Sequence, residues 1–190
     1  MKCCRSYTTL AQVGRGSFST VHQVRRADGR LCALKLVDLT SFSDEKTREQ
    51  ALTEVRILEN LRCPFIVQYY DASVVNGRLR ILLEYCEEGD LRDFLKRRTE
   101  RLSDRTVWQI FGSITSGLEY LHARHILHRD VKSANIFLTP SGVRVGDLGQ
   151  AKQLCNTSCA STLCGTPAYF SPEEALDTEQ YTAKCDMWAL

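Results

Sequence analysis

The sequence predicts an α+β protein of two lobes: a small lobe of five strands and one helix, then a mostly helical lobe. Two observations predict this division. Segments with the alternation of strands occupy residues 7 to 39 and 65 to 85, and they flank one helical stretch over residues 44 to 61. From Thr106 onward, apolar residues recur every three or four positions, which indicates a long helix.

The elements of the small lobe follow from these patterns in chain order. Residues 7 to 39 predict three strands, and the third, residues 31 to 37, alternates as a buried strand with Lys35 in its middle. The helix predicted next places four apolar side chains toward the core: Leu52, Val55, Leu58 and Leu61. Residues 65 to 85 predict two more strands that turn at Asn76-Gly77, a strong hairpin signal.

The boundaries between the predicted parts follow from the same patterns. Residues 1 to 6 form an N-terminal tail, residues 7 to 83 the small lobe, residues 84 to 91 a polar connection, and residues 92 to 190 the second lobe. The long helix of the second lobe should bury one stripe of side chains: Val107, Ile110, Phe111, Ile114, Leu118 and Leu121.

Composition limits the classes of function. The 190 residues are 43% hydrophobic, enough to bury a core, and 25 basic against 23 acidic residues give a net charge of +2. The charges are spread along the chain, so no basic face favours nucleic acid or anionic lipid. No apolar run approaches a membrane span or a secretory signal, and Lys2 excludes the myristoylation pattern beside Cys3-Cys4. We expect a cytoplasmic protein without nucleic-acid or membrane partners; the oligomeric state stays open.

The nine cysteines predict neither a metal site nor a disulfide framework. They show no paired C-x-x-C spacing, and their odd number suits no closed set of disulfides. Cys32 and Cys86 fall where small buried apolar residues are expected. A redox role for Cys155, Cys159 and Cys164 is a weaker alternative.

The most specific signal is H-R-D-V-K-S-A-N at residues 128 to 135, followed twelve residues later by D-L-G at residues 147 to 149. Transfer of a γ-phosphoryl group to a hydroxyl needs a carboxylate beside the attacking oxygen, a cation near the developing charge, and oxygen ligands for metal ions. Four residues supply that set: Asp130, Lys132, Asn135 and Asp147. The spacing resembles the protein-kinase signature, which implies ATP and Mg²⁺ as cofactors and proteins as substrates.

A second group of residues upstream agrees with this resemblance. Residues 14 to 21, G-R-G-S-F-S-T-V, resemble the glycine-rich loop of kinases, with Ser19 at the third glycine; alone, an ordinary hairpin turn would explain them equally well. Lys35 lies within a buried strand and therefore needs anionic partners. The kinase pattern pairs Lys35 with phosphates and with Glu54, whose alternative role is to solvate a helix face.

Three strings together resemble the NIMA-related (NEK) serine/threonine kinases: residues 84 to 91, 128 to 138 and 165 to 173. The resemblance runs from about Tyr7 to the last residue, and it implies the bilobal protein-kinase fold. A kinase catalytic domain needs about 250 residues, so the C-lobe is expected to be incomplete. Residues 186 to 190 resemble the start of its central helix, and we expect the 190-residue chain alone to fold poorly or be inactive.

The resemblance assigns roles to individual residues. Asp130 would accept or orient the proton of the substrate hydroxyl, Lys132 would neutralise γ-phosphate charge, and Asn135 and Asp147 would bind Mg²⁺. The phosphates of the nucleotide would contact Gly14, Gly16, Ser19 and Lys35. The adenine would bind the backbone of Glu84 and Cys86, between the apolar side chains of Val21, Ala33 and Phe137, with Leu83 at the gatekeeper position. Asp90 would contact the ribose. An internal spine would comprise Tyr69, Leu58, Leu148 and His128, tied to Asp186.

Regulation is predicted at Arg129 and in residues 147 to 173. Arg129 is a cation without an acidic partner in the motif, and a phosphate on a nearby loop would supply one. We favour Thr162, four residues before Thr166, as the phosphorylated residue. Ser158 and Ser161 are alternatives, as is a loop that becomes ordered without modification.

Departures from the kinase pattern leave the preferred acceptor and the catalytic competence of the chain open. Leu148 replaces the usual Phe, Ala134 removes an acid that some kinases use to attract basic substrates, and Gln150 leaves the choice between Ser and Thr acceptors open. Glu173 is expected to be a buried carboxylate without its usual arginine partner. The alternative function is a silent pseudokinase or scaffold, although such proteins typically lose residues of the kind retained here: Lys35, Asp130 and Asp147.

Overall fold

The computed structural model of the protein describes residues 7–16, 18–42, 45–154, 165–176 and 181–190. The chain divides into two compact units. Unit 1 contains the described residues up to Arg62 together with Gln68–Tyr85, and unit 2 contains Cys63–Val67 and Cys86–Leu190. The segment between the two parts of unit 1 therefore belongs to the other unit.

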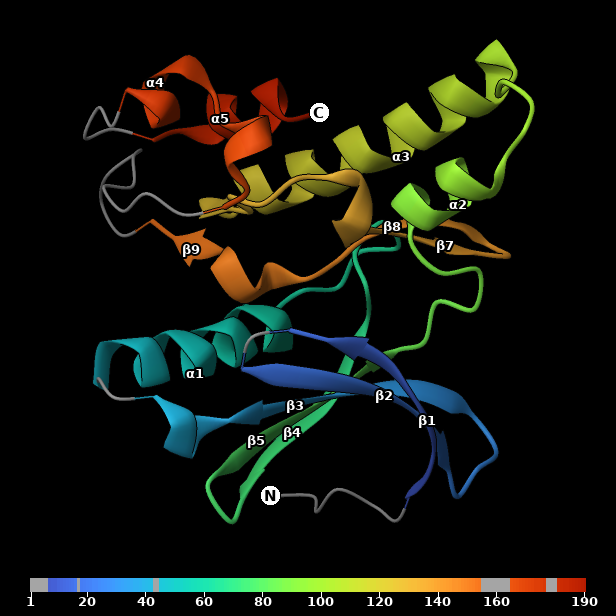
Figure 1. Cartoon of the computed structure of the whole chain (residues 1–190). Coiled ribbons are helices and arrows are strands. Elements are labelled where there is room, and N and C mark those ends of the chain that lie inside the picture. The colour runs from blue at the N-terminus through green and yellow to red at the C-terminus, as the bar shows by residue number, and fades with distance from the viewer. Residues whose placement is uncertain (1–6, 17, 43–44, 155–164, 177–180) are drawn as a thin grey trace. The chain divides into compact units, whose positions relative to one another are not determined.

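Unit 1 is built on a five-stranded antiparallel sheet with the order β1-β2-β3-β5-β4 (Figure 1). Its strands are β1 (Tyr7–Arg15), β2 (Ser19–Arg26), β3 (Leu31–Asp38), β4 (Tyr69–Val75) and β5 (Arg78–Glu84). The predicted five strands are confirmed. The expected start of the fourth strand at residue 65 is wrong, because Ile66 forms a bridge with Val145 in unit 2 and the strand begins only at Tyr69.

The hairpin between β4 and β5 turns at the predicted dipeptide. Asn76 and Gly77 have φ angles of 51° and 73°, the left-handed conformation that a two-residue hairpin turn requires at both positions. The carbonyl of Gly77 also accepts a hydrogen bond from the amide of Leu39 at 3.0 Å. The hairpin is thereby attached to η1 (Leu39–Ser41), the short 3₁₀ turn that follows β3.

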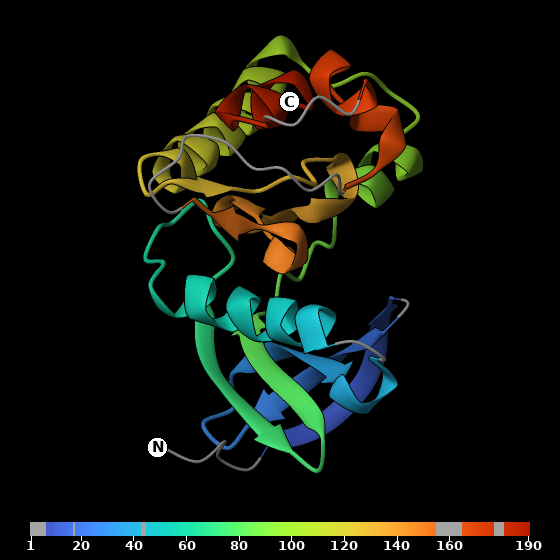
Figure 2. The same cartoon turned by 90° about the vertical axis from the view of Figure 1, so that its left-hand side faces the viewer.

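Helix α1 (Glu45–Glu59) covers one face of this sheet, as two views show (Figures 1 and 2). It buries Ile57 and Leu58. The opposite face of the sheet buries a second cluster: Val24, Cys32, Leu34 and Leu82. Because both faces are covered by apolar contacts, β3 runs through the interior of unit 1 with hardly any exposed residue.

Unit 2 contains four helices among its described residues: α2 (Leu91–Arg97), α3 (Asp104–His122), α4 (Pro172–Ala175) and α5 (Ala183–Trp188). A polar side chain caps the N-terminus of each helix. Asp90, Ser103 and Thr182 accept hydrogen bonds from backbone amides at the starts of α2, α3 and α5. Ser171 and Glu174 form a reciprocal capping box at the start of α4.

The long helix α3 buries only part of the predicted stripe. Ile114, Leu118 and Leu121 are buried, but Val107 and Phe111 are 47% and 41% exposed. The expectation for these two residues is wrong. The C-terminal half of α3 packs against strands of unit 2, as the closeness of Gly117 to Val145 shows, and the first turns extend beyond them.

Two short antiparallel pairs frame the loops of unit 2. β6 (Ile126–Leu127) pairs with β9 (Lys152–Gln153), and β7 (Ile136–Thr139) pairs with β8 (Gly142–Val145). Three 3₁₀ turns follow in the loops: η2 (Ser133–Asn135), η3 (Leu148–Gln150) and η4 (Pro167–Tyr169). The predicted phosphotransfer motifs thus lie between β6 and β7 and directly after β8.

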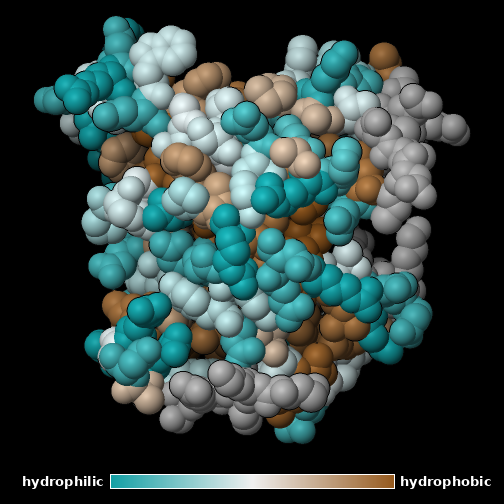
Figure 3. Space-filling model, turned by 180° about the vertical axis from the view of Figure 1, so that it is seen from behind, coloured by the Kyte–Doolittle hydropathy of each residue, from teal (hydrophilic) through white to brown (hydrophobic). Residues whose placement is uncertain are grey.

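The surface is largely polar on the face that Figure 3 shows, where hydrophobic residues form small patches separated by hydrophilic ones. The most exposed large apolar side chains belong to different elements: Trp108 in α3, Leu176 after α4, and Trp188 in α5. Within the described residues, no helix combines the length and apolar character needed to cross a membrane.

Candidate active site

Unit 1 contains a buried ion pair between the two residues that the motifs single out there. The ammonium of Lys35 in β3 lies 2.8 Å from a carboxylate oxygen of Glu54 in α1. Their side chains are 14% and 5% exposed, so each charge offsets the cost of burying the other. Glu54 therefore does not lie on a solvated helix face.

The predicted nucleotide residues of unit 1 share one face of the sheet. Gly14 pairs with Val21, and Val21 pairs with Lys35, so these three form one row across β1, β2 and β3. Ala33 lies two residues before Lys35 and pairs with Leu83 in β5. Because side chains two apart on a strand share a face, Val21, Ala33 and Leu83 lie on the Lys35 side.

The turn between β1 and β2 is closed by a hydrogen bond from the amide of Gly16 to the carbonyl of Ser19, at 2.8 Å. A β-carbon on Gly16 would lie 3.0 Å from the Ser19 hydroxyl, so a larger residue would crowd this turn. Ser17 lies outside the described residues. The three predicted loop positions, Gly14, Gly16 and Ser19, therefore belong to one tight turn at the end of the Lys35 row.

The predicted connection contributes residues to both units. The amide of Glu84 donates to the carbonyl of Gln68 at 2.8 Å, so an adenine contact at Glu84 would use its carbonyl. Asp90 caps α2 by accepting from the amide of Asp93 at 2.8 Å, and it forms a bridge with Phe137 in β7. The Asp90 carboxylate therefore has a structural role that the sequence did not indicate. Cys86, the other predicted contact of this connection, is half-buried and belongs to unit 2.

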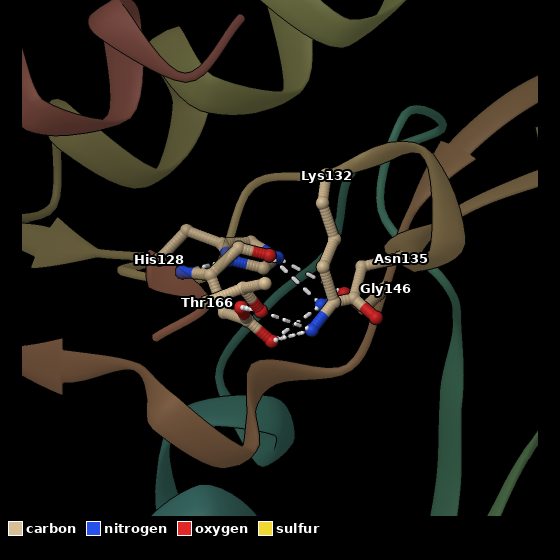
Figure 4. A network of polar contacts seen from close by, with 6 residues as sticks. His128, Lys132, Asn135, Gly146 and Thr166 are labelled. Carbon is tan, nitrogen blue, oxygen red and sulfur yellow. Dashed lines mark hydrogen bonds and ion pairs between the residues drawn. The ribbon is translucent and has the colours of Figure 1, made fainter. Parts of the chain in front are cut away.

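The side chains of Lys132, Asn135 and Thr166 gather in one place within unit 2 (Figure 4), and all three contact the carboxylate of Asp130. Lys132 lies 2.7 Å from Oδ2, the amide nitrogen of Asn135 donates to the same oxygen at 2.9 Å, and the hydroxyl of Thr166 donates to Oδ1 at 2.7 Å. Lys132 also donates to the Thr166 hydroxyl at 2.7 Å. Both carboxylate oxygens therefore have hydrogen-bond or ion-pair partners that fix the orientation of the side chain.

His128 fixes the backbone that carries Asp130. Its ring is fully buried; Nδ1 accepts from the amide of Asp130 at 3.2 Å, and Nε2 lies 3.0 Å from the carbonyl of Gly146. Because Nδ1 acts as an acceptor, the proton is on Nε2, which donates to Gly146. The ring therefore connects the segment after β6 to the segment after β8.

Asp186 in α5 holds the same loop from the other side. Its carboxylate accepts from the amides of His128 and Arg129 at 2.9 and 2.8 Å, and it lies 2.7 Å from Nε2 of His122. Burial raises the pKa of Asp186, but the hydrogen bonds from His122 and from both amides, together with the nearby His128, outweigh it and hold the pKa below its ordinary value. The acceptor therefore stays ionised.

Backbone strain accompanies this arrangement. Arg129 has a φ of 64°, a conformation that non-glycine residues adopt rarely. Gly165 has a φ of 120°, and a β-carbon there would lie only 2.5 Å from the carbonyl oxygen of Arg129. The segment that delivers Thr166 to Asp130 therefore approaches the backbone of Arg129 so closely that position 165 requires glycine.

The predicted regulatory residues are placed only in part. Nε of Arg129 donates to the carbonyl of Gln150 at 2.7 Å, which gives this group a neutral partner. Thr162, Ser158 and Ser161 lie outside the described residues, as do Cys155, Cys159 and Cys164. Thr166, which the sequence suggested only as regulatory, contacts the Asp130 carboxylate directly.

The expectation for Glu173 is wrong. Glu173 is half-buried rather than buried, and it accepts a hydrogen bond from the thiol of Cys185 at 3.4 Å. A hydrogen bond from its own backbone amide, together with the contact to Cys185, lowers the pKa of Glu173. Burial raises the pKa of the Cys185 thiol, which therefore stays protonated and able to donate.

The oxygen donors for a metal ion come from two loops of unit 2. The amide nitrogen of Asn135 is committed to Asp130, which leaves its amide oxygen as the group available to a cation. Asp147 follows β8 in a left-handed conformation, with a φ of 53°. Magnesium is commonly held by one or two protein oxygens together with substrate phosphates, and this donor set fits that chemistry.

A small cavity of about 10 Å³, room for one water, lies within unit 2. Its lining includes Asp130, Thr166, Tyr169, Phe170, Cys185 and Asp186.

Sequence reasoning missed three features of this site. Nothing in the motifs indicated that His122 would contact Asp186, which lies 64 residues away. The contact of Thr166 with Asp130 spans 36 residues and was equally invisible. The capping box of Ser171 and Glu174 could have been found, since S-x-x-E is its sequence signature.

Comparison with known families agrees with this geometry. The family model described as "Protein kinase domain" matches residues 7–190. The chain belongs to the protein kinase family. The predicted α+β kinase fold, with five strands and one helix in unit 1, is confirmed.

The curated relatives of this kinase domain carry Nek names. The chain is 38% identical over 193 residues to probable serine/threonine-protein kinase nek3 of Dictyostelium discoideum, covering 97% of this chain and 17% of that protein. It is 40% identical over 188 residues to serine/threonine-protein kinase Nek1 of Mus musculus, covering 97% and 16%. Rice Nek3 (Oryza sativa subsp. japonica) is 37% identical over 188 residues, covering 97% and 32%.

These comparisons confirm the resemblance to NEK kinases that the three sequence strings indicated. The chain spans between 16% and 32% of the length of these three relatives. It therefore corresponds to one domain-sized part of each.

Proposed function

We propose that this kinase domain transfers the γ-phosphoryl group of Mg-ATP to serine or threonine hydroxyls of protein substrates. The observation that carries the proposal is the carboxylate of Asp130, oriented by Lys132, Asn135 and Thr166. A carboxylate held in a fixed orientation can accept the proton of an incoming alcohol.

The proposed reaction divides its tasks among the residues of unit 2. The acceptor oxygen forms a bond to the γ-phosphorus while the bond to the β-γ bridging oxygen breaks and ADP leaves. The alcohol proton passes to Asp130. Lys132 is already within 2.7 Å of Asp130 and of the Thr166 hydroxyl, so its ammonium would stabilise negative charge that develops there.

Unit 1 would bind the nucleotide. Lys35, oriented by Glu54, would contact phosphate oxygens, and the turn at Gly14 and Gly16 would approach them with its backbone. From unit 1, Val21, Ala33, Leu83 and the carbonyl of Glu84 would contact the base. The sequence also assigns nucleotide contacts to three residues of unit 2, Cys86, Asp90 and Phe137, and these stay predictions. A magnesium ion, which neutralises phosphate charge when bound, would use oxygens of Asn135 and Asp147.

A pseudokinase or scaffold is the alternative function. The contacts at Asp130 favour catalysis instead, because Lys132, Asn135 and Thr166 orient the one carboxylate that the reaction needs. Lys35 and Asp147, which a silent relative typically loses, are also present.

The test is ATP-dependent phosphorylation of casein by a purified protein that contains this chain within a whole kinase domain, with its D130N variant as the matched control. We expect labelled phosphoserine or phosphothreonine, with no signal from the variant or after chelation of Mg²⁺. Equal labelling by the two proteins would remove catalysis at Asp130 and leave the scaffold function.

We also propose a cytoplasmic location and regulation by phosphorylation of Thr162 near Arg129. The four cysteines that the structure describes, Cys32, Cys63, Cys86 and Cys185, form no disulfide with one another, as suits a reducing compartment. Cell fractionation tests the location. For regulation, a T162A variant and the unaltered protein, both dephosphorylated and then incubated with ATP, should differ in recovered activity; equal recovery would exclude Thr162 as the switch.

A further inference from the structure

An aromatic pair joins the glycine-rich turn of unit 1 to the connection between β3 and α1. Phe18 lies just before β2, and the centroid of its ring is 5.2 Å from that of Phe42, with the planes at 64°. This edge-to-face geometry is the favourable one for two aromatic rings. The amide of Asp38 also donates to the carbonyl of Phe18 at 3.2 Å. One side-chain contact and one backbone contact therefore link the same two segments.

Phe18 is 54% exposed, which is unusual for a large apolar ring. A ring that is half in water gains little from burial, so its position depends on the few contacts that it makes. The contact with Phe42 is the aromatic contact that the described residues give it. The ring of Phe42 and the amide of Asp38 are therefore the two contacts that hold Phe18 beside the β3–α1 connection.

Phe42 itself follows a firmly braced turn. Asp38 accepts hydrogen bonds from the amide and hydroxyl of Thr40 at 3.0 and 2.6 Å, and the Ser41 hydroxyl donates to the carbonyl of Asp38 at 2.7 Å. The Leu39 side chain is buried, and its amide is bonded to the β4–β5 hairpin. This bracing makes η1 a fixed support for Phe42.

The same turn is connected to helix α1. Nε of Arg48 in the first turns of α1 lies 3.4 Å from the carbonyl of Leu39. Glu54 follows six residues later on this helix and pairs with Lys35. Contacts therefore run from Phe18 through Phe42 and η1 to the helix that orients the phosphate-binding lysine.

We propose that Phe42 is a positioning residue for nucleotide binding. Its ring holds Phe18, and with it the glycine-rich turn, in a fixed position relative to the β3–α1 connection. The inference rests on the proposed function, because it concerns the turn that would cover the phosphates. Since Asp130 lies in the other unit, loss of the pair weakens ATP binding and leaves the chemical step largely unaffected.

The test is a double-mutant cycle on F18A and F42A, measured in the purified protein. The KM for ATP, kcat, and the Kd of a fluorescent ATP analogue are determined for both single variants and the double variant. Each single variant is expected to raise KM and Kd about two- to tenfold, the range for an aromatic pair, with kcat changed less than about twofold. The double variant should be no weaker than the worse single variant, because both remove one contact.

Controls separate positioning from general damage. F42Y keeps the ring and should bind ATP like the unaltered protein. L10A removes an exposed apolar side chain of β1 in the same unit and should leave KM unchanged. Additive losses in the cycle, or an unchanged KM in F42A, would overturn the role of Phe42. An unaltered protein that bound no ATP would instead overturn the proposed function.

Discussion

The two charged sites of the molecule are built on different physical plans. In unit 1, the Lys35 ammonium and the Glu54 carboxylate are almost fully removed from water and lie 2.8 Å apart. In unit 2, the carboxylate of Asp130 is similarly buried, at 11% exposed, but it has three partners instead of one: Lys132, Asn135 and Thr166. The first site joins β3 to α1, whereas the second is assembled on loops.

This difference separates folding from chemistry. A buried ion pair is costly to break, because the remaining partner is left as an uncompensated charge. A carboxylate with several donors tolerates the loss of one donor, although its basicity and direction change. We therefore expect substitutions in the Lys35–Glu54 pair to reduce stability as well as activity, and substitutions around Asp130 to reduce activity alone.

The largest expected effect is that of D130N on turnover. The amide cannot accept the alcohol proton, so kcat should fall by about 10³-fold, within the usual range for a general base. Asn keeps the size of the side chain, so the thermal midpoint should stay close to that of the unaltered protein. Steady-state kinetics measure kcat, and calorimetry on the same sample measures the thermal midpoint. A large loss of stability would show that Asp130 contributes to folding as well as to chemistry.

Next in size is the effect of K35M on stability. The substitution leaves Glu54 in a site where it is 5% exposed, so unfolding should become easier by about 3 kcal/mol. The double variant K35M/E54L should recover most of this loss while remaining inactive. Denaturant titration measures the stability. If K35M unfolded at the same denaturant concentration as the unaltered protein, the ion pair would not contribute to the stability of the fold.

A smaller effect is expected for T166V, which keeps the shape of the side chain and removes its hydroxyl. Asp130 loses one donor and Lys132 loses one acceptor, so kcat should fall about tenfold, as for a hydrogen bond to a charged group. T166S retains the hydroxyl and should keep most of the activity. Identical rates for T166V and T166S would show that the hydroxyl does not orient Asp130.

The smallest expected effect is the contribution of Asp186 to the pH dependence of stability. Its pKa is lowered in the folded protein, so the unfolded chain binds more protons and stability falls as the pH drops below the ordinary aspartate value of about 4. D186N should be less stable at neutral pH and should show a shallower loss in acid. Unfolding curves from pH 6 to pH 2.5 measure this, and parallel curves for the two proteins would refute it.

Local patterns predicted the parts of the fold that depend on neighbouring residues. Asn76-Gly77 specified its hairpin because both positions need left-handed backbone. Helical spacing found α3 but misjudged Val107 and Phe111, because periodicity shows which side chains share a face and does not show how far the packing partners extend.

The candidate site shows the same limit. The kinase motif singled out Asp130, Lys132 and Asn135, which are close in sequence and lie together. It did not reveal that Thr166 and Asp186 would complete their surroundings, because those contacts depend on how distant loops fold back. Likewise, no pattern pointed to Phe42, whose importance rests on a single ring contact.

The close approach of Gly165 to the carbonyl of Arg129 has an evolutionary consequence. Two main chains approach closely there, so the backbone position of residue 166 depends on the missing side chain at residue 165, and the Thr166 hydroxyl then meets Lys132 and Asp130. Mutational drift can therefore change other residues of this segment while the reacting groups keep their alignment. A single glycine allows the segment to diversify around unchanged chemistry.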